Sequence, residues 1–122
     1  MTQSAAELSK RTPQEVFRHH AQALGNEDLD ATAMDYAEDA VVITQDGVIR
    51  GKSAIRDFFA AVFRAIPQAK WNVKETYVDN ILFLEWTADS MKGSVNDGVD
   101  TFIFKDGLIQ YQTVRYTLEV KG

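Results

Sequence analysis

The chain has 122 residues, 45% of them apolar and 25% charged, which fits one soluble globular domain. It carries 13 Lys and Arg against 18 Asp and Glu, and this net charge of −5 argues against a nucleic-acid-binding surface. The absence of Cys excludes disulfides, thiol catalysis and thiolate metal sites. Any chemistry must therefore use carboxylates, hydroxyls, amides or one of the two His residues, His19 and His20.

The N-terminal segment from Met1 to Arg11 is polar and lacks the apolar core of a signal peptide. Nor does any apolar stretch reach the roughly 18 residues of a transmembrane helix. We therefore expect a cytoplasmic protein that does not bind membranes. No repeat or linker divides the chain, so residues 1–11 are expected to form a flexible extension and residues 12–122 a single domain.

The first half of the chain has mostly helical periodicity. Thr12-Pro13-Gln14-Glu15 has the pattern of a capping box with proline at the first helical position, and Gly25-Asn26 is a typical helix end. A second helix is predicted from about Leu29 to Ala37. A third is predicted from near Ser53 to the residue before Pro67, because its apolar positions recur at helical spacing.

The rest of the pattern favours strands. The runs Val41–Thr44 and Val48–Arg50, separated by a turn, predict a small hairpin between the second and third helices. Met91–Gly98 is polar and contains glycine, so we expect a long loop there. Four further strands are predicted over Trp71–Val78, Ile81–Asp89, Val99–Lys105 and Leu108–Val120. Together these elements predict an α+β fold with three helices packed on an antiparallel meander.

Asp100 is the first candidate for chemistry. Strand alternation places it on the same face as Phe102 and Phe104. A carboxyl group on an aromatic face is either buried with a partner or lies at the rim of a pocket. Burial would raise its pKa and keep it protonated, so that it could donate a hydrogen bond. The alternative is that Asp100 lies near the strand end and meets solvent or caps a turn.

His20 is the second candidate. It shares the predicted buried face of the first helix with Phe17, Ala21 and Leu24, whereas His19 points about 100° away and is expected to face solvent. An inward His can hydrogen-bond a carboxylate and exchange protons near neutral pH. The alternative is a structural His whose hydrogen bonds are satisfied in the core.

A pocket needs further lining residues, and several polar and aromatic side chains are candidates. Trp86 alternates with Leu82 and Leu84 and is expected inside, Tyr36 falls on the second predicted helix, and the face of Gln112 stays open. For the aromatic residues, plain core packing is the alternative. The candidate ligand-binding residues are Phe17, Tyr36, Thr44, Phe63, Trp71, Trp86, Phe102, Gln112 and Tyr116.

No metal or cofactor is expected. The sequence contains no GxGxxG, P-loop, GxSxG or HExxH motif. The two His residues are adjacent, so on a helix they could not easily share one metal ion.

Five stretches carry a recognisable pattern in this order: Ala23–Asp30, Tyr36–Val41, Gly51–Phe59, Asp100–Phe104 and Asp106-Gly107. Together they resemble the nuclear transport factor 2-like superfamily, and within it the SnoaL-like and ketosteroid-isomerase-like proteins. The resemblance runs over nearly the whole chain. It implies a cone-shaped, strongly curved antiparallel sheet, with helices that close one end around a pocket. It also implies a homodimer formed through the outer face of the sheet.

The resemblance assigns roles to three positions. Asp100 is similar in place to the protonated Asp of the oxyanion hole in ketosteroid isomerases, and His20 falls where that family has its oxyanion-hole Tyr. The family's general-base Asp falls at Thr44, whose hydroxyl cannot act as a base unaided at neutral pH. Steroid isomerisation by that mechanism is therefore not expected. A His20–Asp100 pair could instead be an acid/base dyad, as in SnoaL-like cyclases, or a buried ion pair that orients a ligand.

Three functions follow as hypotheses. The first is a cofactor-independent isomerase, cyclase or lyase that acts on a small hydrophobic carbonyl compound through His20 and Asp100. The second is a non-catalytic binding protein that holds a small apolar ligand in the same pocket. The third is a dimeric interaction domain whose function lies on the outer sheet face.

Overall fold

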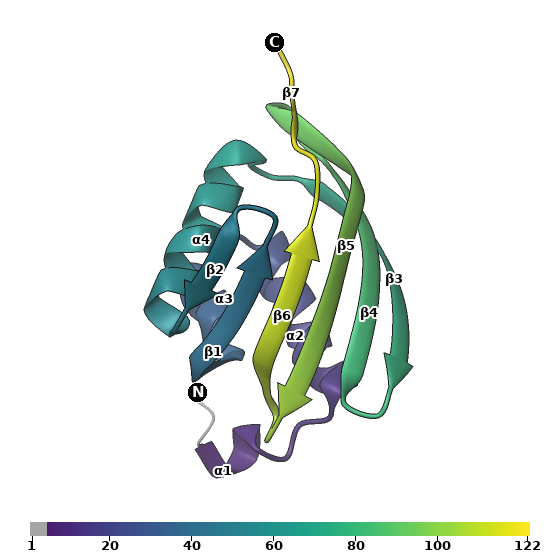
Figure 1. Ribbon diagram of the computed structural model, residues 1–122. Coiled ribbons are helices and arrows are strands. Elements are labelled where there is room, and N and C mark those ends of the chain that lie inside the picture. The colour runs from purple at the N-terminus through teal and green to yellow at the C-terminus, as the bar shows by residue number, and fades with distance from the viewer. Residues whose placement is uncertain (1–4) are drawn as a thin grey trace.

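A computed structural model describes residues 5–122, and in it a curved sheet holds the longer helices on one side (Figure 1). The sheet is open and strongly bent, so the helices lie on its concave face (Figure 1). The elements are α1 (Ala5–Leu8), α2 (Pro13–Gly25), α3 (Leu29–Met34), β1 (Tyr36–Thr44), β2 (Gly47–Arg50), α4 (Lys52–Ala65), β3 (Lys70–Val78), β4 (Ile81–Asp89), β5 (Gly93–Lys105), β6 (Leu108–Arg115) and β7 (Glu119–Val120).

The sheet has the strand order β2-β1-β6-β5-β4-β3, and β7 pairs with β5. Strands β3 to β6 form the antiparallel meander that the alternating pattern predicts. In contrast, β1 pairs with β6 in parallel, with Val42 opposite Gln112, and so joins the N-terminal half to the last long strand. The predicted α+β fold with a curved sheet and few helices is confirmed.

The predicted first helix is confirmed as α2, and its start has the expected capping box. The backbone N–H of Glu15 donates to the Thr12 hydroxyl, and the backbone N–H of Thr12 donates to the Glu15 carboxylate. These bonds satisfy two of the amide groups that a helix start leaves free. None of the helices among residues 5–122 is long and apolar enough to cross a membrane.

The second predicted helix is too long, because α3 ends at Met34 and Tyr36 begins strand β1. The sheet decides this boundary. Tyr36 pairs with Ile109 of β6, and the Ile109 N–H donates to the Asp35 carbonyl at 2.7 Å. The strand ladder therefore takes the carbonyl that a longer helix would have used.

The long loop predicted over Met91–Gly98 is also wrong, because β5 already begins at Gly93. Gly98 is a strand residue against which the Trp86 ring packs, and a Cβ atom there would lie 2.1 Å from that ring. This glycine serves a close approach within the sheet, not a turn. The last predicted strand is shorter than expected, since β6 ends at Arg115 and β7 adds only Glu119–Val120.

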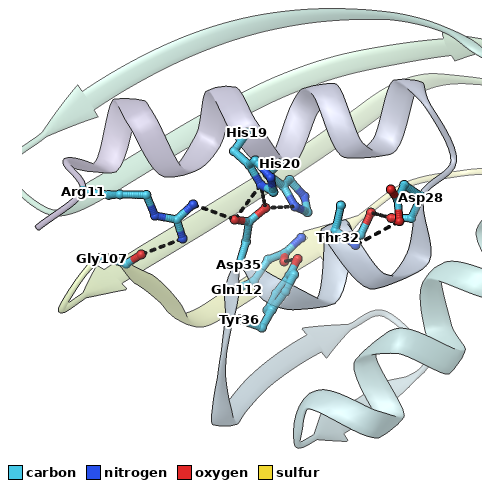
Figure 2. Close-up of polar contacts among 10 residues, drawn as sticks. Arg11, His19, His20, Asp28, Thr32, Asp35, Tyr36, Gly107 and Gln112 are labelled. Carbon is cyan, nitrogen blue, oxygen red and sulfur yellow. Dashed lines mark hydrogen bonds and ion pairs between the residues drawn. The ribbon is translucent and has the colours of Figure 1, made fainter. Parts of the chain in front are cut away.

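The segment before α2 contacts the domain where the structure describes it, and residues 1–4 of the expected extension lie outside the described residues. Arg11 donates to the Asp35 carboxylate at 2.9 Å and to the Gly107 carbonyl at 2.9 Å (Figure 2). Gly107, in the β5–β6 turn, has φ of +74°, and a Cβ atom there would lie 1.8 Å from the Leu8 carbonyl oxygen. The chain on both sides of Ser9 therefore packs on this turn.

The Arg11–Asp35 ion pair is buried, and its loss should be costly. Arg11→Met keeps a side chain similar to the aliphatic part of Arg11 but leaves the fully buried Asp35 carboxylate without its cation. We expect the free energy of unfolding, measured by urea denaturation, to fall by about 3 kcal/mol. The control is Arg56→Met, which breaks the exposed pair with Asp30 and should cost less than about 1 kcal/mol. Equal losses in the two variants would contradict a structural role for Arg11.

Candidate functional site

A narrow cavity lies between the concave face of the sheet and helices α2 and α4. Its volume is about 80 Å³, counted as the space that the centre of a water-sized sphere can occupy. Most of its wall is apolar, which is typical of small-ligand sites. The lining residues are Phe17, His20, Ala21, Leu24, Phe58, Phe59, Val62, Ile66, Trp71, Val73, Leu84, Trp86, Asp100, Phe102, Gln112, Val114 and Tyr116.

Asp100 on β5 brings a carboxyl group into this apolar wall. It is buried, and so are Phe102 and Phe104 on the same strand face, as alternation predicts. The Trp86 indole N–H donates to Oδ1 of Asp100 at 2.7 Å, and the Gln112 amide donates to Oδ2 at 2.9 Å. Burial raises the pKa of Asp100 to about 7, although the two hydrogen bonds act in the opposite direction. At neutral pH the carboxyl group is therefore poised between its acid and carboxylate forms.

A chain of hydrogen bonds fixes how Gln112 meets Asp100. The Tyr36 hydroxyl donates to Oε1 of Gln112 at 2.5 Å, and Figure 2 shows the two side chains in contact. Because this oxygen is occupied, the amide nitrogen of Gln112 faces Asp100. Burial raises the pKa of the Tyr36 hydroxyl further above its already high value, so the group stays a donor. Tyr36 therefore acts behind the cavity wall and does not line it.

His20 on α2 is almost fully buried among aromatic rings. The centroids of Tyr36, Phe59 and Phe102 lie 5.6–5.8 Å from its own. Burial lowers the pKa of His20 to about 4, although the nearby Asp35 carboxylate opposes this shift. His20 therefore carries no charge near neutral pH.

His20 and Asp100 line the same cavity, as the sequence analysis proposes, but among the described residues no hydrogen bond joins them. Asp100 is bonded to Trp86 and Gln112. The charged group beside His20 is Asp35, whose Oδ2 lies 4.0 Å from the His20 Nδ1. The two side chains thus reach one cavity separately and do not form a directly bonded pair.

The structure divides the other candidate residues into three groups. Phe17, Trp71, Trp86, Phe102, Gln112 and Tyr116 line the cavity. Phe63 packs against the core and Tyr36 lies behind Gln112. Thr44 lies at the end of β1, where its hydroxyl donates to the Gly47 carbonyl and accepts from the Asp46 N–H in the β1–β2 turn. Thr44 is therefore a turn residue and does not line the cavity.

The expectation that His19 faces solvent is wrong. Its Nδ1 lies 2.8 Å from both carboxylate oxygens of Asp35, to which it donates (Figure 2). Sequence reasoning did not identify Asp35, because a single Asp between two short elements gives no periodic signal. Phe58, Phe59 and Val62 on α4, which were not among the candidate ligand-binding residues, line the cavity as well.

One wall of the cavity is a row of aromatic rings. The Trp71 and Trp86 rings have centroids 5.4 Å apart, and those of Trp86 and Tyr116 are 5.8 Å apart. Trp86, the middle ring of this row, also donates the hydrogen bond to Asp100, so the carboxyl group lies beside the row. Neighbouring rings are tilted by 46–47° to each other, so they offer an apolar aromatic surface of ring faces and edges to a ligand.

Comparison with known protein families agrees with this geometry. The profile of the SnoaL-like domain matches residues 17–112. The chain belongs to the SnoaL-like domain family. None of the curated proteins matches this SnoaL-like chain.

Solved structures similar to this SnoaL-like protein share its fold at low sequence identity. A Kribbella flavida protein provisionally assigned as a ketosteroid isomerase is 16% identical with a TM-score of 0.72, covering 86% of this chain and 77% of that one. A Sinorhizobium meliloti protein provisionally assigned as a polyketide cyclase is 20% identical with a TM-score of 0.67, covering 81% and 92%. An NTF2-like protein of unknown function from Cytophaga hutchinsonii is 15% identical with a TM-score of 0.74, covering 88% and 92%. At such identities the likeness shows the fold alone.

The raised pKa of Asp100 predicts how stability depends on pH. Between the ordinary value near 3.8 and about 7, the folded state holds a proton on Asp100 that the unfolded chain has lost. Stability from this group is thus full at low pH and declines up to about pH 7. Asp100→Asn cannot ionise, so from pH 5 to pH 8 it should gain on the order of 2 kcal/mol relative to wild type in urea unfolding.

The control for this comparison is Glu85→Gln, which makes the same chemical change at an exposed position on the opposite face of β4. Its difference from wild type should not vary between the two pH values. A pH-independent difference for Asp100→Asn would show that Asp100 ionises normally in the folded protein.

Proposed function

We propose that this SnoaL-like protein binds a small, flat, apolar carbonyl compound in the cavity and transfers a proton on it without a cofactor. The observation that carries the proposal is the buried carboxyl group of Asp100 in an apolar wall, with its pKa raised to about 7. A carboxyl group kept neutral can donate a hydrogen bond or a proton to a carbonyl oxygen. The SnoaL-like fold and its neighbours assigned to isomerase and cyclase chemistry support this reading by analogy.

The shape and chemistry of the cavity describe the ligand. No Lys or Arg is among the lining residues, so an anionic ligand would be buried without a countercharge. The aromatic row of Trp71, Trp86 and Tyr116 favours a planar molecule, and the small volume favours a slender one. Asp100, which is hydrogen-bonded to the middle ring of this row, favours a ligand that carries a hydrogen-bond acceptor.

The reaction that fits these groups is enolisation. His20, uncharged near neutral pH, takes a proton from the carbon next to the carbonyl, and the electrons of the broken C–H bond form the C=C bond. Asp100 gives its proton to the carbonyl oxygen, so the ketone becomes an enol while His20 becomes a cation and Asp100 an anion. In the return step His20 gives a proton to the same or, in a conjugated enol, another carbon, while the enol O–H gives its proton back to Asp100 and the C=O bond re-forms. Both side chains are then restored, and exchange or isomerisation is complete.

Hydrogen–deuterium exchange on 2-indanone, a flat apolar ketone, tests this proposal. The wild-type protein should accelerate exchange of the α-protons in D₂O, followed by ¹H NMR, between about pH 4, below which His20 is protonated, and about pH 7, above which Asp100 is ionised. Asp100→Asn and His20→Gln should each lower kcat at least about 100-fold. Glu85→Gln, outside the cavity, should retain wild-type activity.

The outcomes separate the two pocket hypotheses. Saturable shifts of cavity methyl signals on titration with 2-indanone, without faster exchange, would identify a non-catalytic binding protein. Neither binding nor exchange at millimolar ketone would refute the assignment of the cavity to carbonyl compounds.

We also propose that a second copy of the chain covers the outer face of the sheet. Ile81, Phe83, Val99, Ile103 and Tyr111 are exposed there on three neighbouring strands. The strand register sets Ile103 between Ile81 and Tyr111, so these side chains form a continuous patch. Monomeric proteins rarely expose large contiguous apolar patches.

The cytoplasmic location stays a prediction of the sequence.

Light scattering tests the dimer. The wild type should have the mass of two chains at micromolar concentration, and Phe83→Lys, which places a charge in the apolar patch, should have the mass of one. Met91→Lys is the matched control, because Met91 is an exposed apolar residue in the β4–β5 turn. A monomeric wild type would contradict this assembly.

A further inference from the structure

Asp35 is a fully buried carboxylate that lies outside the cavity, at the junction of α3 and β1. Its Oδ1 accepts a hydrogen bond from Arg11, and both of its oxygens contact the Nδ1 of His19. On the same side, Oδ2 faces the Nδ1 of His20 at 4.0 Å (Figure 2). The charged and titratable side chains beside Asp35 are thus Arg11, His19 and His20.

The two ring nitrogens of His20 have different surroundings. Nδ1 is sealed from solvent and has no hydrogen-bond partner among the described residues. Nε2 is not among these sealed, unpartnered atoms, and His20 lines the cavity. Nε2 is therefore the nitrogen that a ligand can reach.

A neutral imidazole carries one N–H, and its surroundings decide which nitrogen holds the proton. With the proton on Nδ1, the positive end of the N–H bond points toward the Asp35 carboxylate. With the proton on Nε2, a lone pair on Nδ1 would face this negative charge in a medium of low dielectric constant. The first arrangement is therefore favoured, and it leaves a lone pair on Nε2.

We infer that Asp35 is a positioning residue, which holds His20 as the Nδ1–H tautomer so that Nε2 faces the cavity as a base. This inference rests on the proposed function only in calling His20 the base. It follows separately from the geometry that Asp35 selects the tautomer.

Burial explains why Asp35 can select the tautomer without charging the ring. An isolated carboxylate beside His20 would stabilise the imidazolium form. Here burial outweighs this effect and lowers the pKa of His20, while the guanidinium group of Arg11, 2.9 Å from Oδ1, is the cation paired with the carboxylate. The negative charge of Asp35 orients the Nδ1–H bond of His20, and the ring stays neutral and able to accept a proton.

Long-range ¹H–¹⁵N correlation spectra of the histidine side chains test the inference near pH 7. The chain has only two His residues, so His19→Gln assigns the signals of His20. In the wild type, Nε2 of His20 should show the downfield shift of an unprotonated ring nitrogen. In Asp35→Asn, Arg11 should hold the new amide oxygen, so the amide N–H group faces Nδ1 and the proton moves to Nε2.

The matched control is Asp28→Asn, which makes the same change at the N-cap of α3 and should leave the tautomer as in the wild type. A wild-type His20 with its proton on Nε2 would overturn the inference, even if Asp35→Asn does not fold. So would a folded Asp35→Asn protein whose His20 keeps the Nδ1–H form.

Kinetics separate this inference from the proposed function. If 2-indanone is a substrate, Asp35→Asn should lower kcat at least about tenfold with little change in KM, because the base loses its lone pair and the wall of the cavity keeps its shape. An inactive wild type with the expected tautomer would refute the proposed reaction and leave the role of Asp35 intact.

Discussion

The Asp35 carboxylate has no exposure to solvent, and several segments of the chain meet at it. Arg11 reaches it from the N-terminal segment and ties it to the β5–β6 turn at Gly107, while His19 reaches it from α2. A buried carboxylate costs several kcal/mol unless partners surround it, so these segments must be in place together. The position of α2 against the sheet, and hence the orientation of the His20 side chain, depends on the Asp35 carboxylate.

Periodicity predicted most of the fold because, in most elements, the apolar side chains fall on one face that packs against the core. Strand β4 was predicted with its observed limits, and α2 and α4 to within one or two residues. The failures lie where a distant strand decides the local structure. Tyr36 is a strand residue because it pairs with Ile109. Gly98 lies in a strand, where the Trp86 ring occupies the space of a Cβ atom. Neither partner is visible in a local window of sequence.

The site was predictable to the extent that it follows from alternation. Asp100 and His20 stood out because each is a polar residue on an apolar face, and both line the cavity. Trp86, Gln112 and Tyr36 were also candidates, but the hydrogen bonds that join them to Asp100 and to each other did not follow from the sequence. Gln112 and Tyr36 are 76 positions apart in the chain, and only the parallel β1–β6 pairing explains their contact. Thr44 was a candidate as a polar residue at a strand end and by family resemblance, but its hydroxyl donates to the Gly47 carbonyl in a turn.

The parallel pairing of β1 with β6 has a consequence for the order of folding. The β3–β6 meander needs only hairpins between neighbours, which close short loops. The strand β1 pairs with β2 as a local hairpin, but this hairpin joins the rest of the sheet only once β6 is present. On the ribosome the N-terminal third therefore emerges first and docks last, and the aromatic residues around His20 remain exposed until then. The parallel β1–β6 pairing that brings Tyr36 to Gln112, beside Asp100, therefore also joins segments far apart in the chain, and such pairing is slow to form.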